Sequence, residues 1–361
     1  MRFLSVKNAW KVTALMLAIM LLAFSVVGCG GGQQATNGQA NGGEQAPEQT
    51  PPQESIVWVF GHLASPDHPY QKAAEVFRDK LDEYTDGVIK LDIKGAGALG
   101  DEASMLELYK TGDMQAGIQF SGSVAAVAEQ FGFLAIPFLF DSYEHWESVM
   151  HTEEGRAFWN DILAQERAGF RVGAIGTEGT RSIYSKEPIT TIEDFSGLKM
   201  RIPENPIMAT VWGSLGCIPV SLPFADVYSG LQAGLIDASE NSPTGYTHFA
   251  HQEVAKYYLL TRHEVSAAWM MVADNAYEAL SPDLQQKVDQ ALADVQVEWL
   301  RIAKEAELVK QDQLETEMGV TITEPSPELL DQLTGIVMPV VEQLAEERNM
   351  LEFFELVNAR R

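Results

Sequence analysis

The sequence predicts an α/β fold of two lobes, with a long C-terminal helix that runs along both of them. Strand-like and helix-like patterns alternate through residues 55–240, which favours a parallel sheet covered on both faces. Residues 55–361 are also enough for two lobes with separate cores. Finally, a helical pattern extends from Ser281 to Met318, about 55 Å at 1.5 Å per residue, which exceeds the width of one small lobe.

The individual elements follow from local patterns. β-branched and aromatic runs predict strands, whereas apolar residues at helical spacing predict helices. The predicted strands cover residues 55–63, 88–94, 114–120, 170–176, 199–203 and 235–240. The predicted helices cover residues 69–84, 101–110, 225–234 and 281–318. A Ser-Pro pair at Ser326 has the cap-and-proline pattern that begins a further helix.

The N-terminus has the pattern of a secretory signal peptide. The basic residues Arg2, Lys7 and Lys11 precede an apolar, uncharged run over residues 12–27. A permanent membrane span needs about twenty apolar residues, so this run is marginal for one. We therefore expect a signal peptide over residues 1–28, with an uncleaved anchor as the alternative. Either interpretation places the body of the protein outside the cytoplasm.

The cysteine that follows indicates a lipid anchor. The Val-Val-Gly-Cys sequence ending at Cys29 resembles a bacterial lipobox, in which the cysteine is lipidated and becomes the mature N-terminus. Residues 30–54 are rich in Gly, Gln, Asn, Ala and Pro and contain almost no large apolar residue, so they cannot bury enough surface to fold. We expect residues 29–54 to tether the folded body to the membrane as a flexible linker.

The chain is strongly acidic, with a formal net charge of −26 at pH 7. Loss of the basic residues of the signal peptide would make the mature chain more acidic still. Nucleic-acid binding depends on Lys and Arg side chains that neutralise phosphates, so this charge argues against a nucleic-acid partner. It also argues against adhesion to anionic lipid headgroups. Any arginine that binds an anion must therefore act locally, inside a pocket.

Motifs for catalysis, metals and cofactors give no support for an enzyme. The sequence has no C-x-x-C, H-E-x-x-H or G-x-S-x-G motif, and its seven histidines form no zinc-like cluster. Residues 95–100 do match G-x-G-x-x-G, but no acidic residue follows the next predicted strand to bind a ribose hydroxyl. We expect no cofactor and no metal, and we interpret these glycines as a tight turn at the edge of a cleft.

The most specific motifs lie between Gly179 and Asn241. They read G-T-R-S-I-Y-S-K-E-P-I at residues 179–189, D-F-S-G-L-K-M-R-I-P-E-N at residues 194–205, and L-G-C-I-P-V-S-L-P-F-A-D-V-Y-S-G-L-Q-A-G-L-I-D-A-S-E-N at residues 215–241. These blocks resemble the solute-binding component of tripartite ATP-independent periplasmic (TRAP) transporters, the DctP family. The similarity extends over nearly the whole body. It implies a periplasmic-binding-protein-like fold in which two lobes close a cleft on an organic acid.

The resemblance implies roles for five residues. Arg201 holds the ligand carboxylate, and Arg181 gives a second contact. Asn241 donates to the same carboxylate, Phe224 packs on the ligand, and His62 faces the cleft. The chemistry agrees for Arg201, because a guanidinium presents a planar fork of donors that matches a carboxylate. A structural ion pair with one of the many acidic residues is the alternative for this arginine.

Four further residues are candidates for ligand specificity: Phe120, Trp269, Tyr246 and Glu178. Plain packing or surface roles are the alternative for each of them. Phe120 and the number of aromatic residues favour a ligand with an apolar or aromatic part. We place lobe I at residues 55–178 with 267–306, and lobe II at residues 179–266 with 307–361.

Together these features predict an extracytoplasmic lipoprotein that captures a small organic acid and delivers it to the membrane permease subunits of a TRAP transporter. One alternative is a ligand-sensing lipoprotein that feeds a signalling receptor. Another is a secreted hydrolase or lyase, but no clustered nucleophile or acid–base pair occurs at motif spacing. The rest of the ligand stays open among C4-dicarboxylates, 2-oxo acids, sugar acids, sialic acid and aromatic acids.

Overall fold

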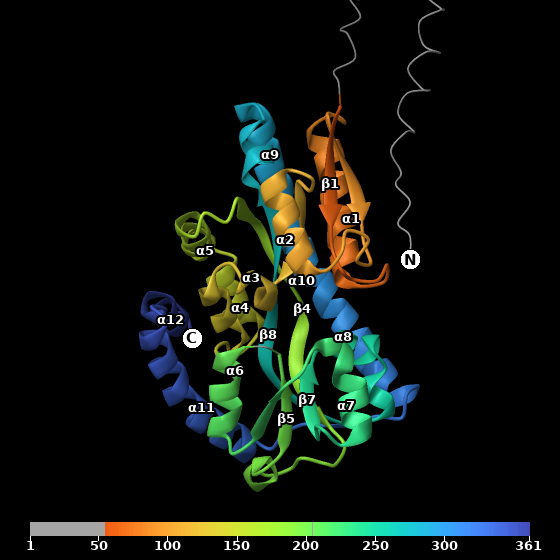
Figure 1. Ribbon diagram of the computed structural model, residues 1–361, viewed down its shortest axis with the longest axis vertical. Helices are drawn as coiled ribbons and strands as arrows, with labels where there is room; N and C mark the ends of the chain where they lie inside the picture. Colours follow the sequence, from red (N-terminus) through yellow and green to blue (C-terminus); the bar gives the residue numbers. More distant parts are fainter. Residues whose placement is uncertain (1–54, 204) are drawn as a thin grey trace, which may run out of the picture. The chain divides into compact units, whose positions relative to one another are not determined.

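Two long strands, β4 (Phe170–Ser185) and β8 (Tyr257–Ala273), pair antiparallel through the middle of a mixed sheet (Figure 1). The computed structural model describes residues 55–203 and 205–361. The predicted signal peptide, the lipidation site Cys29 and the linker lie outside the described residues. None of the helices in the described ranges is both long and apolar enough to cross a membrane.

The other elements agree in most places with the sequence patterns. The shorter strands are β1 (Ile56–Gly61), β2 (Ile89–Lys94), β3 (Ala116–Phe120), β5 (Lys199–Ile202), β6 (Ile218–Ser221), β7 (Ala238–Asn241) and β9 (Thr321–Thr323). The α-helices are α1 (Pro69–Tyr84), α2 (Glu102–Thr111), α3 (Ser121–Val124), α4 (Tyr143–Met150), α5 (Glu153–Gln165), α6 (Pro206–Ser214), α7 (Val227–Ala233), α8 (Pro243–His248), α9 (Asp274–Glu278), α10 (Pro282–Thr316), α11 (Pro327–Glu347) and α12 (Leu351–Asn358). The 3-10 helices are η1 (Glu129–Ala135), η2 (Ile192–Phe195), η3 (Phe224–Asp226) and η4 (His251–Glu253).

The sheet has the strand order β2-β1-β3-β8-β4-β7-β5-β6, and β9 pairs with β8. The expectation of a parallel sheet is wrong for its centre, because β8 runs antiparallel to β3 and to β4, and β4 runs antiparallel to β7. The outer pairs β1–β2 and β5–β6 are parallel, as expected. Strands that are buried on both faces read as continuous apolar runs, so their periodicity contains no information about direction.

Strand β4 continues well past the predicted end at Gly176, through an irregular segment at its middle. The pairing with β8 shifts register between Thr177 and Thr180, and Gly179 between them has a φ of +130°. Glycine tolerates this backbone conformation, whereas other residues adopt it rarely. The carboxylate of Glu307 on α10 accepts hydrogen bonds from the Thr180 amide, at 2.9 Å, and from the Thr180 hydroxyl. This bulge sets the positions of the flanking residues Glu178 and Arg181.

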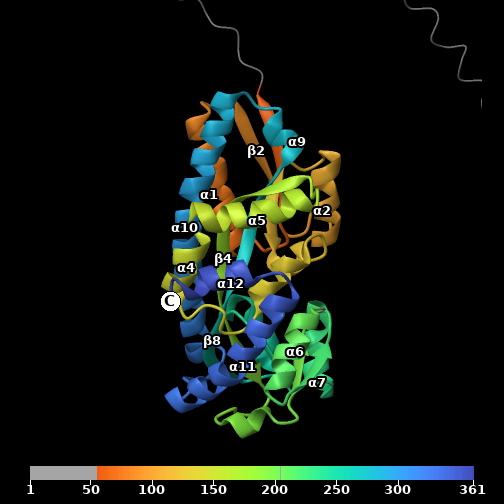
Figure 2. The same ribbon diagram turned by 90° about the vertical axis from the view of Figure 1, so that its left-hand side faces the viewer.

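Helix α10 packs along much of the described molecule, as its predicted length requires. It begins at a Ser281 cap, whose hydroxyl accepts from the Leu284 amide at 3.4 Å. The helix contacts α1 and β4 over one part of its length and α8 and β9 over another (Figures 1 and 2). Trp299 on α10 packs edge-on against Tyr70 of α1, with ring centroids 5.7 Å apart. Burial of such side chains stabilises the fold by about 1.5–3 kcal/mol each.

Buried apolar side chains form three clusters on different parts of the sheet. One contains Trp58, Phe77 and Trp299 between the N-terminal strands, α1 and α10. A second is built around the stacked rings of Tyr184 and Tyr258. The largest extends beneath α5, α6, α11 and α12. Separate clusters are what two lobes require, while the exact lobe boundaries stay a prediction.

Candidate functional site

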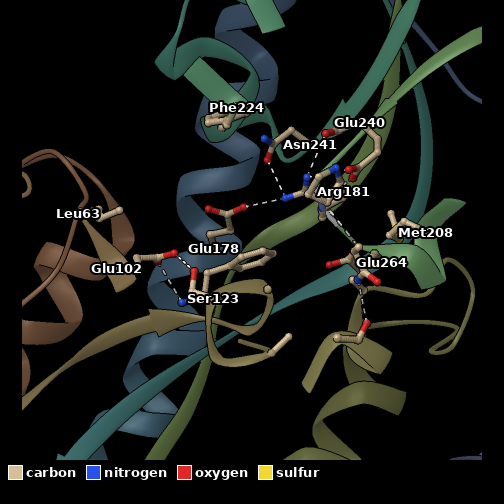
Figure 3. Close-up of a pocket in the computed structure, with 18 of the residues that line it drawn as sticks. Leu63, Glu102, Ser123, Glu178, Arg181, Met208, Phe224, Glu240, Asn241 and Glu264 are labelled. Carbon is tan, nitrogen blue, oxygen red and sulfur yellow. Dashed lines mark hydrogen bonds and ion pairs between the residues drawn. The ribbon is translucent and has the colours of Figure 1, made fainter. Parts of the chain in front are cut away.

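A cavity of about 900 Å³ lies between residues from the two halves of the chain. Its walls come from the N-terminus of α2, the end of β3, the bulge of β4, and the strands β5, β7 and β8 (Figure 3). The tight turn at Ala96 and Gly97 forms part of its edge, as the glycine motif predicts. The cavity brings together six of the predicted ligand-binding residues: Phe120, Glu178, Arg181, Arg201, Phe224 and Asn241.

Arg201 is a buried cation with unused donors. Its side chain is on β5 and is 4% exposed. Nε donates to the Leu222 carbonyl at 2.9 Å, and the guanidinium carbon lies 5.6 Å from the centroid of the Phe224 ring. Within the described residues, no carboxylate forms an ion pair with it. Burial lowers the pKa of Arg201, the direction expected for a cation without a close counter-ion.

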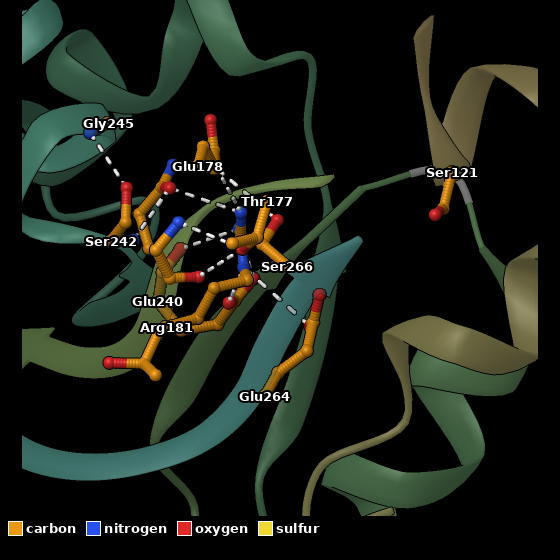
Figure 4. A network of polar contacts seen from close by, with 12 residues as sticks. Ser121, Thr177, Glu178, Arg181, Glu240, Ser242, Gly245, Glu264 and Ser266 are labelled. Carbon is orange, nitrogen blue, oxygen red and sulfur yellow. Dashed lines mark hydrogen bonds and ion pairs between the residues drawn. The ribbon is translucent and has the colours of Figure 1, made fainter. Parts of the chain in front are cut away.

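Arg181 has the opposite environment, because all five of its N–H donors are in use (Figure 4). Nε and Nη2 donate to the two carboxylate oxygens of Glu240, at 2.5 and 2.9 Å, and Nη2 also donates to the Glu240 carbonyl at 3.1 Å. Nη1 donates to Glu178 at 3.2 Å and to the Asn241 side-chain oxygen at 3.1 Å. A ligand contact from Arg181 would have to replace one of these bonds, so that role stays a prediction.

Three carboxylates surround this one guanidinium, and their pKa values diverge. Burial acts to raise the pKa of Glu240, but the charge of Arg181 and a bond from His263 outweigh it and lower this pKa. Burial raises the pKa of Glu264 to about 8; its nearest oxygen is 3.7 Å from Arg181 Nε. At neutral pH Glu264 is therefore a protonated acid, which can donate a hydrogen bond into the cavity that it lines.

Asn241 and Phe224 complete the wall beside Arg201. The Asn241 side-chain oxygen accepts from Arg181 and from the Ser242 amide, at 2.8 Å. These bonds orient the amide so that its nitrogen, which has no partner among the described residues, is available as a donor. Phe224 lies in η3 and packs edge-on against Phe249, at a centroid distance of 5.1 Å. Its apolar ring excludes water next to the guanidinium.

Three predicted ligand contacts do not line the cavity. His62 is fully buried, and its ring nitrogens bond to the Gln71 side chain, at 2.9 Å, and to the Ala64 amide, at 3.2 Å. Trp269 is a core residue, with its centroid 4.8 Å from that of Phe131. Tyr246 packs on other tyrosine rings and donates its hydroxyl to a backbone carbonyl. Packing satisfies each of these side chains away from the cavity, which corrects the expectation for all three.

The cavity also contains residues that the sequence patterns do not identify. Glu102 is the first residue of α2, and its carboxylate accepts from the Phe120 amide, at 3.3 Å, and from the Ser123 hydroxyl. From the far C-terminal part, Arg348 lines the cavity and pairs with Glu129 at 3.0 Å. A lone glutamate at a helix start has no distinguishing pattern, and periodicity does not indicate where a C-terminal helix packs. Glu240 had a signal, as the acidic residue of the E-N motif.

Comparison with known proteins agrees with this geometry. The family model of bacterial extracellular solute-binding protein, family 7 (DctP), matches residues 60–348. Solute-binding protein RD1_1052 of Roseobacter denitrificans is 30% identical over 303 residues, which cover 81% of this chain and 92% of that protein. The C4-dicarboxylate-binding periplasmic protein DctP of Rhodobacter capsulatus is 27% identical, over 81% of this chain and 87% of that protein.

Solved structures give the same relationship. A TRAP periplasmic solute-binding protein of Sulfitobacter sp. NAS-14.1, with bound β-D-galacturonate, is 26% identical and has a TM-score of 0.72. The match covers 84% of this chain and 98% of that one. These similarities confirm the predicted family and the two-lobed fold class, and they correspond to substrate-binding transporter components rather than to enzymes.

Proposed function

The chain belongs to the family 7 bacterial extracellular solute-binding proteins, the substrate-binding components of TRAP transporters, and from this premise we propose that its cavity binds a small organic acid through Arg201. The family is extracytoplasmic and works with a membrane permease. It binds its substrate without chemical change. The family relationship favours delivery to a permease over the signalling alternative.

The observation that carries this proposal is the unpaired charge of Arg201. A buried guanidinium with free donors is unfavourable until an anion joins it, because burial removes the water that would otherwise solvate it. A ligand carboxylate can accept two parallel hydrogen bonds from the planar fork. The free amide nitrogen of Asn241 can donate to the same carboxylate, while Phe224 shields the pair from water.

We propose that binding closes two lobes over the ligand. Residues of both predicted lobes line the cavity: Glu102 and Phe120 belong to lobe I, whereas Arg201 and Asn241 belong to lobe II. The irregular centre of β4 at Gly179 lies between these two groups in the chain. Closure about this segment would bring a ligand carboxylate at Arg201 into contact with lobe I.

The ligand class follows partly from the relatives. One relative binds a C4-dicarboxylate and one solved structure contains β-D-galacturonate, so the shared chemistry is a carboxylate on a small polar molecule. Phe120 and Phe224 supply apolar faces in the cavity. Such faces suit an aromatic group, and they equally suit the C–H face of a sugar ring. We propose a sugar acid as the substrate class.

The finer localisation is also part of the proposal. We infer that a signal peptide over residues 1–28 directs export and that Cys29 is then lipidated, with residues 29–54 as a linker to the binding body. The test is fractionation of cells that express the full chain. The wild type is expected in the membrane fraction, and Cys29→Ser is expected to lose incorporation of labelled fatty acid. Equal labelling of both proteins would contradict lipidation.

Calorimetry with D-galacturonate tests the role of Arg201. Arg201→Ala is expected to cost roughly 2–5 kcal/mol of binding free energy, as for the loss of one partner of a buried charge pair. Arg262→Ala is the matched control, because Arg262 forms a half-exposed pair with Glu324 far from the cavity lining. Unchanged affinity in Arg201→Ala, with intact folding by circular dichroism, would overturn the proposed function.

A further inference from the structure

The cavity has a second polar end, formed by Glu102 and Ser123. Glu102 stands at the N-terminus of α2, and Ser123 lies on the short helix α3 (Figure 3). The Ser123 hydroxyl donates to one carboxylate oxygen of Glu102, and the Phe120 amide donates to the other, at 3.3 Å. Two separate elements therefore fix the orientation of this carboxylate. Arg201 and Asn241 belong to other elements, β5 and β7.

Glu102 differs from the neighbouring carboxylates because it has no cationic partner among the described residues. Glu178 pairs with Arg181 at 3.2 Å, and Glu129 pairs with Arg348 at 3.0 Å. An ionised carboxylate has about four lone-pair positions, of which the two bonds to Glu102 use only two. The remaining acceptor capacity is available to a molecule in the cavity.

The charges at this end decide what kind of group can approach. A second carboxylate on the ligand would face Glu102, with Glu178 also in the cavity wall. Like charges at short range repel strongly where water is excluded. An apolar group would leave the acceptors of Glu102 without partners, which is also unfavourable. Hydroxyl groups satisfy them, because each donates a hydrogen bond and brings no charge.

We propose that Glu102 is a specificity-determining residue that accepts hydrogen bonds from ligand hydroxyls, so that the substrate is a polyhydroxylated monocarboxylate rather than a dicarboxylate or an acid with an apolar tail. This inference rests on the proposed function, since it requires Arg201 to hold the single carboxylate. Ser123 is a positioning residue in this arrangement, because its hydroxyl directs the Glu102 carboxylate.

The titration of Glu102 provides an independent readout. Burial raises the pKa of Glu102 to about 7; the Phe120 amide opposes this shift, and the charges of Glu178 on β4 and Asp101 at the start of α2 add to it. Hydroxyl donors stabilise the ionised form, so binding of a hydroxy acid should expel a proton from Glu102. Binding of a second carboxylate would have the reverse effect and take up a proton.

Three acids of matched size separate these alternatives in calorimetry: D-galacturonate, galactarate, and cyclohexanecarboxylate. Galactarate keeps the hydroxylated chain and adds a second carboxylate, while cyclohexanecarboxylate keeps a ring and lacks hydroxyls. The wild type is expected to prefer galacturonate about 10-fold or more over galactarate and about 100-fold or more over cyclohexanecarboxylate. A preference for either of the other two acids overturns the inference.

Two variants then assign the discrimination to Glu102. Glu102→Gln keeps the shape and removes the charge, so galacturonate should bind about 10-fold or more weakly and the preference over galactarate should narrow. Glu107→Gln is the control, because Glu107 is an exposed residue of the same helix that pairs with Lys110. If Glu102→Gln keeps the wild-type preferences, the inference fails. Arg201→Ala should weaken all the acids, and its failure to do so would instead reject the proposed function.

Proton release completes the test. Galacturonate binding at pH 7, measured in phosphate and in Tris buffer, should release up to about half a proton, since Glu102 is half-protonated there. Glu102→Gln should abolish this release while its melting temperature shows an intact fold. A wild-type protein that takes up protons, or a variant that releases as many as the wild type, contradicts hydroxyl recognition by Glu102.

Discussion

Arg181 and Glu240 form a bidentate ion pair in the protein interior, with Nε–Oε2 and Nη2–Oε1 distances of 2.5 and 2.9 Å. The pair joins the adjacent strands β4 and β7 directly beside the cavity. Burial alone would favour the neutral forms of both groups, and the mutual attraction reverses this, raising the pKa of Arg181 and lowering that of Glu240. Arg181 thus supports the binding wall, and Arg201 has the free donors.

Removal of one partner of this pair should be strongly destabilising. Arg181→Ala is expected to lower the free energy of unfolding by about 3–5 kcal/mol, because Glu240 would remain buried without a counter-ion. Urea denaturation measures the change. The exposed pair of Arg262 and Glu324 provides the comparison, and Arg262→Ala should cost less than about 1 kcal/mol. Equal effects of the two substitutions would contradict the structural role of Arg181.

Gly245 on α8 should be intolerant of a side chain. A Cβ atom at this position would collide with the Asn241 side chain, so Gly245→Ala should displace the amide that orients towards the ligand. We expect roughly 10-fold weaker binding of D-galacturonate, measured by calorimetry.

Gly335 offers the matched control for this substitution. It lies inside α11, where an added Cβ atom would meet nothing within 4 Å beyond the backbone of its own helix. Gly335→Ala should therefore raise stability by about 0.5–1 kcal/mol through helix propensity and leave binding unchanged. Tight binding by Gly245→Ala would show that Asn241 is not needed in its present orientation.

Glu264 should make the protein less stable as the pH rises. Its folded pKa is raised by burial from 4.5 to about 8, so the folded state keeps a proton that the unfolded state has lost. Its contribution is therefore present below about pH 4.5 and declines up to about pH 8, by at most about 1.4 kcal/mol per pH unit. Glu264→Gln should remove this component of the slope in urea titrations between these pH values. The same slope in the variant would assign the dependence to other groups.

Glu307 should connect helix α10 to the centre of β4. Its carboxylate accepts from the Thr180 amide and hydroxyl and from the Tyr143 hydroxyl. Glu307→Ala leaves these buried donors without a partner, and we expect a loss of about 1–3 kcal/mol of stability by urea denaturation. Glu305→Ala, on the same helix in an exposed pair with Arg301, should change stability little. Similar losses in both variants would mean that the connection has no special role.

Local patterns were sufficient for the helices and for the identity of the central cation. Helix α1 spans Pro69–Tyr84, as predicted, because its apolar spacing and its first-turn proline are properties of adjacent residues. Arg201 was identified because its motif is contiguous in the chain. His62 and Trp269 were assigned to the ligand incorrectly, since the position of a residue on a strand does not reveal which other side chains will pack around it.

The sequence by itself determined the family, the alternating elements and Arg201, because each is encoded in neighbouring residues. Only the tertiary structure decided that β4 and β8 pair antiparallel, that Arg181 uses every donor, and that Glu102 lies in the same cavity as Arg201. The physical reason is that hydrogen-bond partners and burial are set by chain segments far apart in sequence. A side chain's charge is known from its identity, whereas its free donors and its pKa depend on the groups that folding brings beside it.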